Sequence, residues 1–292
     1  MPLAPQCTYF LYEKNKPVRP QGALWRAPLP QERGVFRGTL KAAAGGRVSH
    51  GMYFKAAHAF LSSNDYEPLL TAVSKTLLCP ININDINKIN IVLEKHGQYY
   101  HPGRIEVLVK GQTVALVLNV ALSSQGRACL QREYGLLQQL NETYAWKFLP
   151  QVYAMGEAKL ADGPKASLFV GQWFQDFHEF HLVRNPDSGK PCLVVWDPLQ
   201  GPRPVSISQA EAIYEQAATI LTAYFDLITL DQVFAWHHAA GDFIVNIDQG
   251  QPRVKLITVR RYTPLFEQIE HDAETFMQAL LVFLLNLSIR MR

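Results

Sequence analysis

The sequence of 292 residues lacks the features that mark several classes of protein. Its 18 glycines and 18 prolines are too few for a fibrous or low-complexity chain. Hydrophobic residues at 48% and aromatic residues at 11% exclude intrinsic disorder. Lysine and arginine exceed aspartate and glutamate by only 28 to 25. Because nucleic-acid binding usually requires a basic patch, we expect no nucleic-acid partner.

Cysteine patterns, targeting signals and long apolar runs are also lacking. The four cysteines are scattered without a CxxC pair, which excludes a zinc ribbon or a secreted disulfide scaffold. The N-terminus has neither the basic start nor the apolar stretch of a signal peptide. The longest apolar run, over 279–285, is far shorter than the roughly 20 residues that span a bilayer. We therefore expect a cytoplasmic protein without a membrane partner, and a buried helix at this run.

The first half of the chain predicts helices followed by an antiparallel sheet. Several prolines within 1–50 favour an irregular surface arm, and an apolar stripe predicts a helix over 53–78 with an interruption at Asn64-Asp65. Three strands are then predicted over 89–95, 104–110 and 113–121. The pair Gly111-Gln112 between the last two is typical of a type II′ hairpin turn. The three strands should form a meander.

The second half alternates single helices with short strands. The predicted elements are a helix over 126–140, strands over 148–155 and 167–174, a loop over 185–204, a helix from about Ser208, strands over 243–247 and 254–259, and a final helix. Ser208 and Glu211 fit a capping box. The buried stripe of the helix after Ser208 is expected to continue through Leu227 and Ile228. The chain ends directly after the last helix, so we expect a truncated C-terminal domain.

Four stretches follow one another in the order found in kinases. Residues 131–140 correspond to the N-lobe helix, 148–156 to the segment after it, 168–174 to the strand before the hinge, and 237–246 to the catalytic loop. In this the chain resembles the protein-kinase-like superfamily, and within it the aminoglycoside and choline phosphotransferases. The resemblance implies an α+β, two-lobed, kinase-like fold with an N-terminal helical extension. The implied parts are an arm and helical extension over 1–84, an N-lobe over 85–180 and a helical C-lobe over 181–292, possibly cut short.

Glu133 is the most informative single residue of the predicted helix. It follows Cys129 and precedes Leu136 and Leu140 at helical spacing, so it interrupts an apolar face. A buried carboxylate requires a cation or several hydrogen-bond donors. The resemblance implies a cofactor-binding role, because the family's glutamate pairs with a lysine that holds nucleotide phosphates. The alternative is a rotated helix with Glu133 at its solvent-exposed rim.

Three family positions differ in this chain. Asn119 stands where the resemblance places the strand lysine, and a short neutral amide cannot clamp phosphate. The loop over 96–103 has only two glycines, so it reads as an ordinary loop, although Tyr99, Tyr100 and His101 could stack on a ligand. Residues 258–260 replace the family's Asp-Phe-Gly, which removes the metal-binding carboxylate.

The segment around Asp242 is the sharpest polar cluster. The resemblance implies catalytic roles for His238 and Asp242 and a metal-binding role for Asn246. If the histidine is aligned first, Ala240 and Val245 occupy the functional positions and the loop is inert. A tight turn in which Asp242 caps backbone donors is the structural alternative. A metal site of His237 or His238 with Asp242 has too few ligands to be stable.

The altered positions suggest that another cation pairs with Glu133, and they argue against ordinary phosphotransfer. We expect Arg260 or Arg261 to pair with Glu133 in place of the lysine and the metal. The first hypothesis is a degenerate kinase-like domain that binds a small molecule or a protein partner without phosphotransfer. The alternative is an active small-molecule or sugar phosphotransferase, and ATP and Mg²⁺ follow as cofactors only in that case. A scaffold module without any ligand is the third.

Overall fold

A computed structural model describes residues 4–11, 16–30, 48–160, 165–185, 188–197, 200–236, 241–264, 266 and 272–291. The protein is of mixed α+β class, as the sequence predicts. It divides into two compact units. Unit 1 comprises Met1–Tyr134 and Gln151–Trp173, and unit 2 comprises Gly135–Pro150 and Phe174–Arg292.

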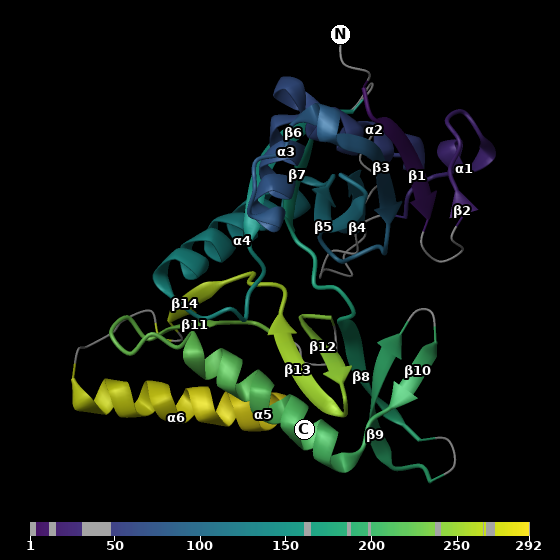
Figure 1. The fold of residues 1–292 in the computed structure, drawn as a ribbon. Helices are drawn as coiled ribbons and strands as arrows, with labels where there is room; N and C mark the ends of the chain where they lie inside the picture. The colour runs from purple at the N-terminus through teal and green to yellow at the C-terminus, as the bar shows by residue number, and fades with distance from the viewer. Residues whose placement is uncertain are drawn as a thin grey trace. The chain divides into compact units, whose positions relative to one another are not determined.

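Unit 1 is built on a seven-stranded sheet with the order β2-β1-β3-β4-β5-β7-β6 (Figure 1). Its strands are β1 (Gln6–Leu11), β2 (Lys16–Pro17), β3 (Ile86–Leu93), β4 (His101–Val109), β5 (Gln112–Ala121), β6 (Val152–Lys159) and β7 (Lys165–Gln172). Only β1 and β3 are parallel, and all other neighbours are antiparallel. The predicted meander is confirmed as β3-β4-β5, whereas the expected irregular arm is wrong for β1. That segment gains ladder hydrogen bonds along the edge of β3, which no local pattern reveals.

The turn between β4 and β5 differs from the predicted type II′ turn. Val109 pairs with Gln112, so the two turn residues are Lys110 and Gly111. Their φ angles are 48° and 79°. Two positive φ values define a type I′ turn, whose twist matches that of the flanking strands.

Two helices cover one face of this sheet. They are α2 (His50–Leu61) and α3 (Ser63–Leu77), preceded by the short α1 (Ala23–Arg26) and followed by a 3₁₀ turn at Ile83–Asp85. Both α2 and α3 contact β6 and β7. The predicted interruption is confirmed, because Asn64, Asp65 and Tyr66 all have positive φ. The buried aromatic side chains of α2, Tyr53, Phe54 and Phe60, join the core of the unit.

The helix α4 (Ser124–Thr143) runs from unit 1 into unit 2. Its buried residues recur at helical spacing and are Gly126, Leu130, Glu133, Leu137 and Leu140. Glu133 is only 1% exposed, so the alternative that placed it at a solvent-exposed rim is wrong. Cys129 and Leu136 flank this stripe and are half-buried.

Unit 2 contains a five-stranded sheet with the order β10-β9-β8-β12-β13 and a two-stranded sheet of β11 and β14. Its strands are β8 (His178–Arg184), β9 (Pro191–Asp197), β10 (Gly201–Pro204), β11 (Asp231–Val233), β12 (Phe243–Asp248), β13 (Gln251–Leu256) and β14 (Tyr262–Pro264). The predicted hairpin over 243–259 is confirmed as β12-β13. The predicted loop over 185–204 is wrong, because it contains β9 and β10. The apolar centre of β9 is buried, and the prolines of β10 are tolerated because it is an edge strand.

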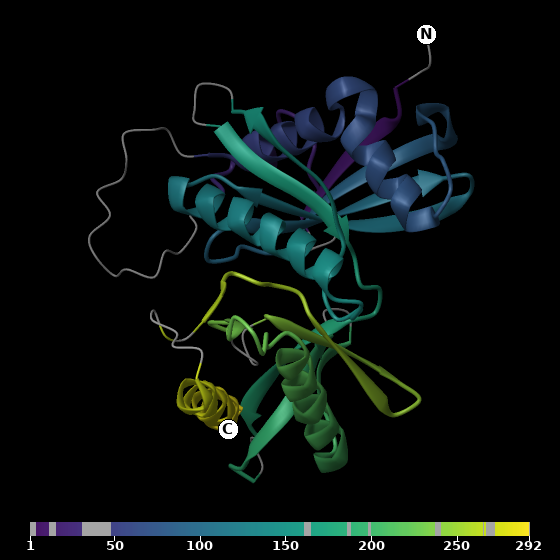
Figure 2. The same ribbon diagram turned by 90° about the vertical axis from the view of Figure 1, so that its left-hand side faces the viewer.

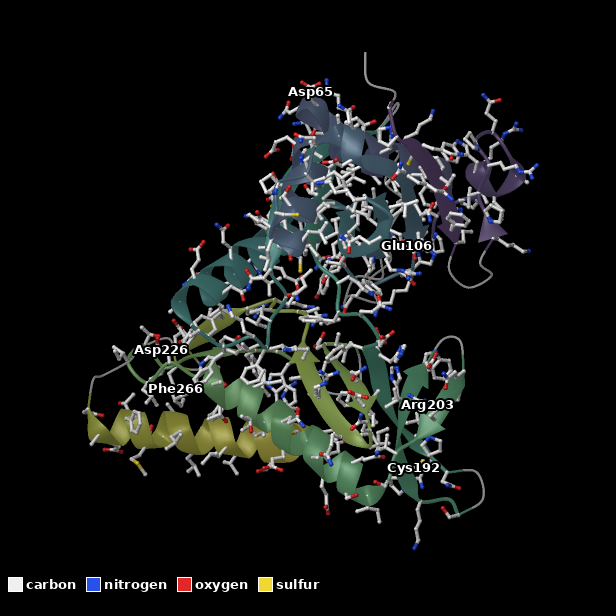
Figure 3. The ribbon with its side chains drawn as sticks, in the orientation of Figure 1. Asp65, Glu106, Cys192, Arg203, Asp226 and Phe266 are labelled. Atoms are coloured by element: carbon white, nitrogen blue, oxygen red, sulfur yellow. The ribbon has the colours of Figure 1, made fainter. Side chains whose placement is uncertain are left out.

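The helix α5 (Ile207–Ala223) begins and ends earlier than predicted. Ser206 and Gln209 form the capping box, rather than Ser208 and Glu211. After α5 the Asp226 side chain, labelled in Figure 3, accepts hydrogen bonds from the backbone N–H groups of Ile228 and Thr229. The resulting turn leaves Leu227 and Ile228 exposed, contrary to the predicted stripe.

The last helix, α6 (Ala273–Arg290), is not the buried helix expected at the apolar run. Only Ala279, Phe283 and Leu287 are buried. Among the described residues, α6 is the one helix long and apolar enough to cross a membrane by length and composition, and it is only weakly apolar. In both ribbon views it lies along the outer edge of unit 2 (Figures 1 and 2).

Candidate functional site

Glu133 has a partner in unit 1 that is not a cation. The hydroxyl of Tyr100 donates a hydrogen bond to Glu133 Oε2 at 2.8 Å, and both side chains are buried. Tyr100 comes from the β3–β4 loop, which in the implied fold would cover nucleotide phosphates. A phenol hydroxyl therefore satisfies part of the carboxylate's hydrogen-bonding capacity.

The β3–β4 loop uses its own backbone donors. The N–H groups of Glu94 and Lys95 donate to the Pro102 carbonyl at 3.1 Å and 3.3 Å, and the N–H of Gly97 donates to the Tyr100 carbonyl at 3.0 Å. A Cβ atom at Gly97 would lie 2.6 Å from that same carbonyl oxygen, which explains the glycine. Phosphate cradles need such N–H groups to point at the ligand. Here two of these N–H groups tie the loop to Pro102 at the start of β4, and the third closes the loop onto Tyr100.

Asn119 occupies the position where the resemblance places a lysine. It lies on β5 opposite Pro102 of β4 and Phe169 of β7, and it is buried. Burial of a neutral amide avoids the large desolvation penalty of an unpaired charge. This position supplies no positive charge for a phosphate.

In unit 2, Asp242 is held by a bidentate ion pair. Arg260 Nη2 lies 2.8 Å from Asp242 Oδ1, and Arg260 Nη1 lies 3.0 Å from Asp242 Oδ2. The Thr258 hydroxyl also donates to Asp242 Oδ1, at 2.8 Å. The Asp242 side chain is 2% exposed. Both carboxylate oxygens are therefore engaged by protein donors.

The β12-β13 hairpin explains this meeting. Phe243 pairs with Leu256, and the N–H of Ile257 donates to the Asp242 carbonyl at 2.8 Å, so the residues after β13 run alongside Asp242. Gly241, just before it, has a φ of 79°, and a Cβ there would lie 2.7 Å from Glu179 Oε1. The Gly-Asp pair thus has a local structural reason.

Asn246 does not present a free oxygen to a metal ion. Its Oδ1 accepts a hydrogen bond from Arg253 Nη2 at 2.8 Å, and its Nδ2 donates to the Asp176 carbonyl at 2.8 Å. Mg²⁺ requires oxygen ligands and is repelled by a neighbouring guanidinium. Asp242, with Arg260 against both oxygens, is equally unsuited. These residues do not fit the Mg²⁺ and ATP that an active kinase would need.

Two sequence predictions remain open. His238, the second predicted catalytic residue, lies outside the described residues, as does His237. The predicted pair of Arg260 with Glu133 would join residues of different units, and it stays a prediction. The observed partner of Arg260, Asp242, was not predicted from the sequence.

The sequence predictions named His101 only as a residue that could stack on a ligand, and they missed the histidine cluster in unit 1 to which it belongs. His96 Nδ1 and His101 Nδ1 are 3.1 Å apart, and the His50 ring lies 6.4 Å from that of His96. In this hydrogen bond one Nδ1 must donate a proton and the other must accept it, so the two imidazole rings cannot both be in the cationic form. Burial, followed by the neighbouring His96 and His50, lowers the pKa of His101 to about 3. Burial also lowers the pKa of His50.

No sequence signal could have revealed the cluster, because α2 contributes His50 and β4 contributes His101. Within the described part of the chain, no group of three or more histidine, cysteine, aspartate or glutamate residues is placed to hold a metal ion. The cluster instead combines two buried histidines, His50 and His101, with the exposed His96, whose ring is hydrogen-bonded to that of His101.

Comparison with known proteins adds no family. The sequence matches no protein-family model and no curated protein sequence.

Proposed function

We propose that the chain is a two-lobed, kinase-like domain that binds a protein partner or another ligand without transferring phosphate. The order of elements supports the kinase-like part of this proposal. A three-stranded meander, the helix α4, the strands β6 and β7, the helix α5 and the hairpin β12-β13 follow one another as in that superfamily. The β8-β9-β10 strands are an addition to that order.

The observation that carries the proposal is the engagement of Asp242. A kinase needs a carboxylate that orients the attacking hydroxyl and oxygen ligands that hold the metal. Asp242 has Arg260 and Thr258 on its two oxygens, and Asn246 has Arg253 on its single oxygen. A hydroxyl substrate or a cation would have to displace these donors.

Three features of unit 1 support the same reading. Asn119 carries no positive charge, three N–H groups of the β3–β4 loop donate to carbonyls of Tyr100 and Pro102, and the Tyr100 hydroxyl donates to Glu133. In unit 2, exposed apolar side chains gather on α6 and after α5. Large exposed apolar patches mark interaction surfaces, so binding to protein is favoured over binding to nucleotide.

Thermal-shift measurements on the full chain test the proposal. ATP is added alone, with Mg²⁺ and with Mn²⁺, to the wild type, to Asp242→Asn and to Asp248→Asn, an exposed control at the far end of β12, the strand that follows Asp242. We expect no metal-dependent shift in any of them. A nucleotide shift that needs metal, persists in Asp248→Asn and vanishes in Asp242→Asn would refute the proposal and favour the active phosphotransferase.

A further inference from the structure

Five large apolar side chains are exposed on one side of α6. Their exposed fractions range from 49% to 68%, and they are Met277, Leu281, Leu284, Leu285 and Ile289. The buried side of the same helix packs into unit 2 through Ala279, Phe283 and Leu287. Side chains project outward along α6 in Figure 3. We call the five exposed residues the α6 outer face.

The spacing of this face fits a second helix. Met277, Leu281 and Leu284 follow one another at intervals of four and three residues, which is the spacing of the seam along which two nearly aligned helices pack. No charged residue lies between Thr275 and Ile289. Helices that lie on membrane surfaces usually carry many Lys and Arg residues on their polar side, and α6 has Arg290 alone. A helix therefore fits better than a lipid surface.

The face is complementary to itself. In a two-fold symmetric pair, each residue meets the counterpart required by the symmetry. If two α6 helices run antiparallel and cross at the level of Phe283, Met277 lies at the level of Ile289 of the second copy. Leu281 then lies at the level of Leu285 of the second copy. Every large residue of the outer face except Leu284, which lies near the crossing, has a large apolar counterpart.

Charges at the two ends favour the same orientation. Glu274 lies in the first turn of α6 and Arg290 in the last, so an antiparallel copy brings opposite charges together at both ends. Antiparallel helix dipoles also attract. Arg290 Nη1 donates to the Trp236 carbonyl at 3.1 Å, which fixes this end of the helix to unit 2. Other N–H groups of the same guanidinium can donate to a second copy.

The available area is sufficient for a dimer. Five half-exposed large side chains offer on the order of 500 Å² per copy. Two such faces together offer about 1,000 Å², which is the lower limit for a specific interface. We propose that α6 is a homodimer interface in which the outer faces of two copies pack antiparallel and cross at the level of Phe283. This inference does not depend on whether the chain transfers phosphate.

The test is the mass of the full chain in solution, measured by light scattering after gel filtration and by sedimentation velocity over a dilution series. We expect the wild type to have the mass of two chains. Leu281→Glu with Leu285→Glu should give the mass of one chain, because like charges then face each other. Leu78→Glu, an exposed leucine of unit 1, is the matched control and should leave the dimer intact.

A charge-swapped variant tests the register. Leu281→Lys with Leu285→Glu places each lysine opposite a glutamate of the second copy, so the dimer should return. Circular dichroism of each variant shows that the fold is kept, and recovery in the charge-swapped variant excludes general damage to α6. A wild type that is monomeric at every concentration would overturn the proposal. So would a double-glutamate variant that remains dimeric, or a monomer that instead sediments with phosphatidylcholine or phosphatidylserine vesicles.

Discussion

The ion pair of Asp242 with Arg260 leads to a quantitative prediction for Arg260→Leu. The guanidinium makes two contacts, at 2.8 Å and 3.0 Å, with a carboxylate that is 2% exposed. Removing one partner of a buried pair costs about 3–5 kcal/mol, because the other charge stays buried. The Arg260 side chain is 27% exposed and Thr258 still donates to the carboxylate. We therefore expect Arg260→Leu to lower the free energy of unfolding by about 3 kcal/mol, at the low end of that range.

A double-mutant cycle separates the buried charge from the lost packing. Asp242→Asn removes the charge but keeps an acceptor for Thr258. It should therefore lower the free energy of unfolding by less than Arg260→Leu does, roughly 1–2 kcal/mol. Combining it with Arg260→Leu leaves no charge unpaired. The double variant should therefore lose less than the sum of the single variants, with a coupling of up to about 3 kcal/mol.

The assay is urea unfolding of the full chain, followed by hydrogen exchange of the β12 and β13 amides, which reports on unit 2. Arg253→Leu, on β13, is the matched control, since its bond to Asn246 is exposed and should be worth less than about 1 kcal/mol. An Arg260→Leu variant within about 0.5 kcal/mol of the wild type would refute the reasoning. Single losses that simply add would refute it as well.

Four further predictions concern unit 1. Because burial holds the pKa of His101 at about 3, against 6.5 in the unfolded chain, the unfolded chain binds one more proton between these pH values. The free energy of unfolding should therefore fall as the pH decreases below 6.5, by about 1.4 kcal/mol per pH unit. In urea unfolding, the free energy of His101→Gln should depend less steeply on pH. Identical pH dependence in the two proteins would contradict this. The Tyr53 hydroxyl is buried and has no hydrogen-bond partner among the described residues, so Tyr53→Phe should leave the Tm unchanged or higher. A lower Tm in this variant would contradict the prediction. A Cβ at Gly103 would lie 2.6 Å from the Tyr53 hydroxyl oxygen, so Gly103→Ala should lower the free energy of unfolding by roughly 1–3 kcal/mol. Calorimetry should show that adding Tyr53→Phe restores part of this loss. Tyr100→Phe should lower the free energy of unfolding by about 1.5–3 kcal/mol, because its hydrogen bond to Glu133 is removed. Glu133→Gln still accepts that hydrogen bond and should have a smaller effect. Equal losses of the two variants in urea unfolding would contradict the prediction.

Local periodicity was enough to find most elements of unit 1. Alternation predicted the β3-β4-β5 meander, and a helical stripe placed Glu133 on the buried face of α4. Where a boundary depends on a single turn or cap, prediction failed. The type I′ turn at Lys110-Gly111 and the cap at Ser206 each lie one or two residues from the predicted position. Neighbouring residues compete for such roles with nearly equal free energies, so sequence alone does not choose between them.

The sequence by itself determined which residue types stand at the positions that the resemblance marks: Asn119 for the strand lysine, a loop with few glycines, and Thr-Val-Arg at 258–260 for Asp-Phe-Gly. Only the tertiary structure decided what those residues do. Asp242 and Arg260 meet because the β12-β13 hairpin returns the chain alongside itself, and Tyr100 reaches Glu133 across 33 positions of sequence. The exposed outer face of α6 was equally hidden, since an apolar run looks the same whether its neighbours cover it or not. Pairing and burial arise from contacts between distant segments, and a local window of sequence does not contain them.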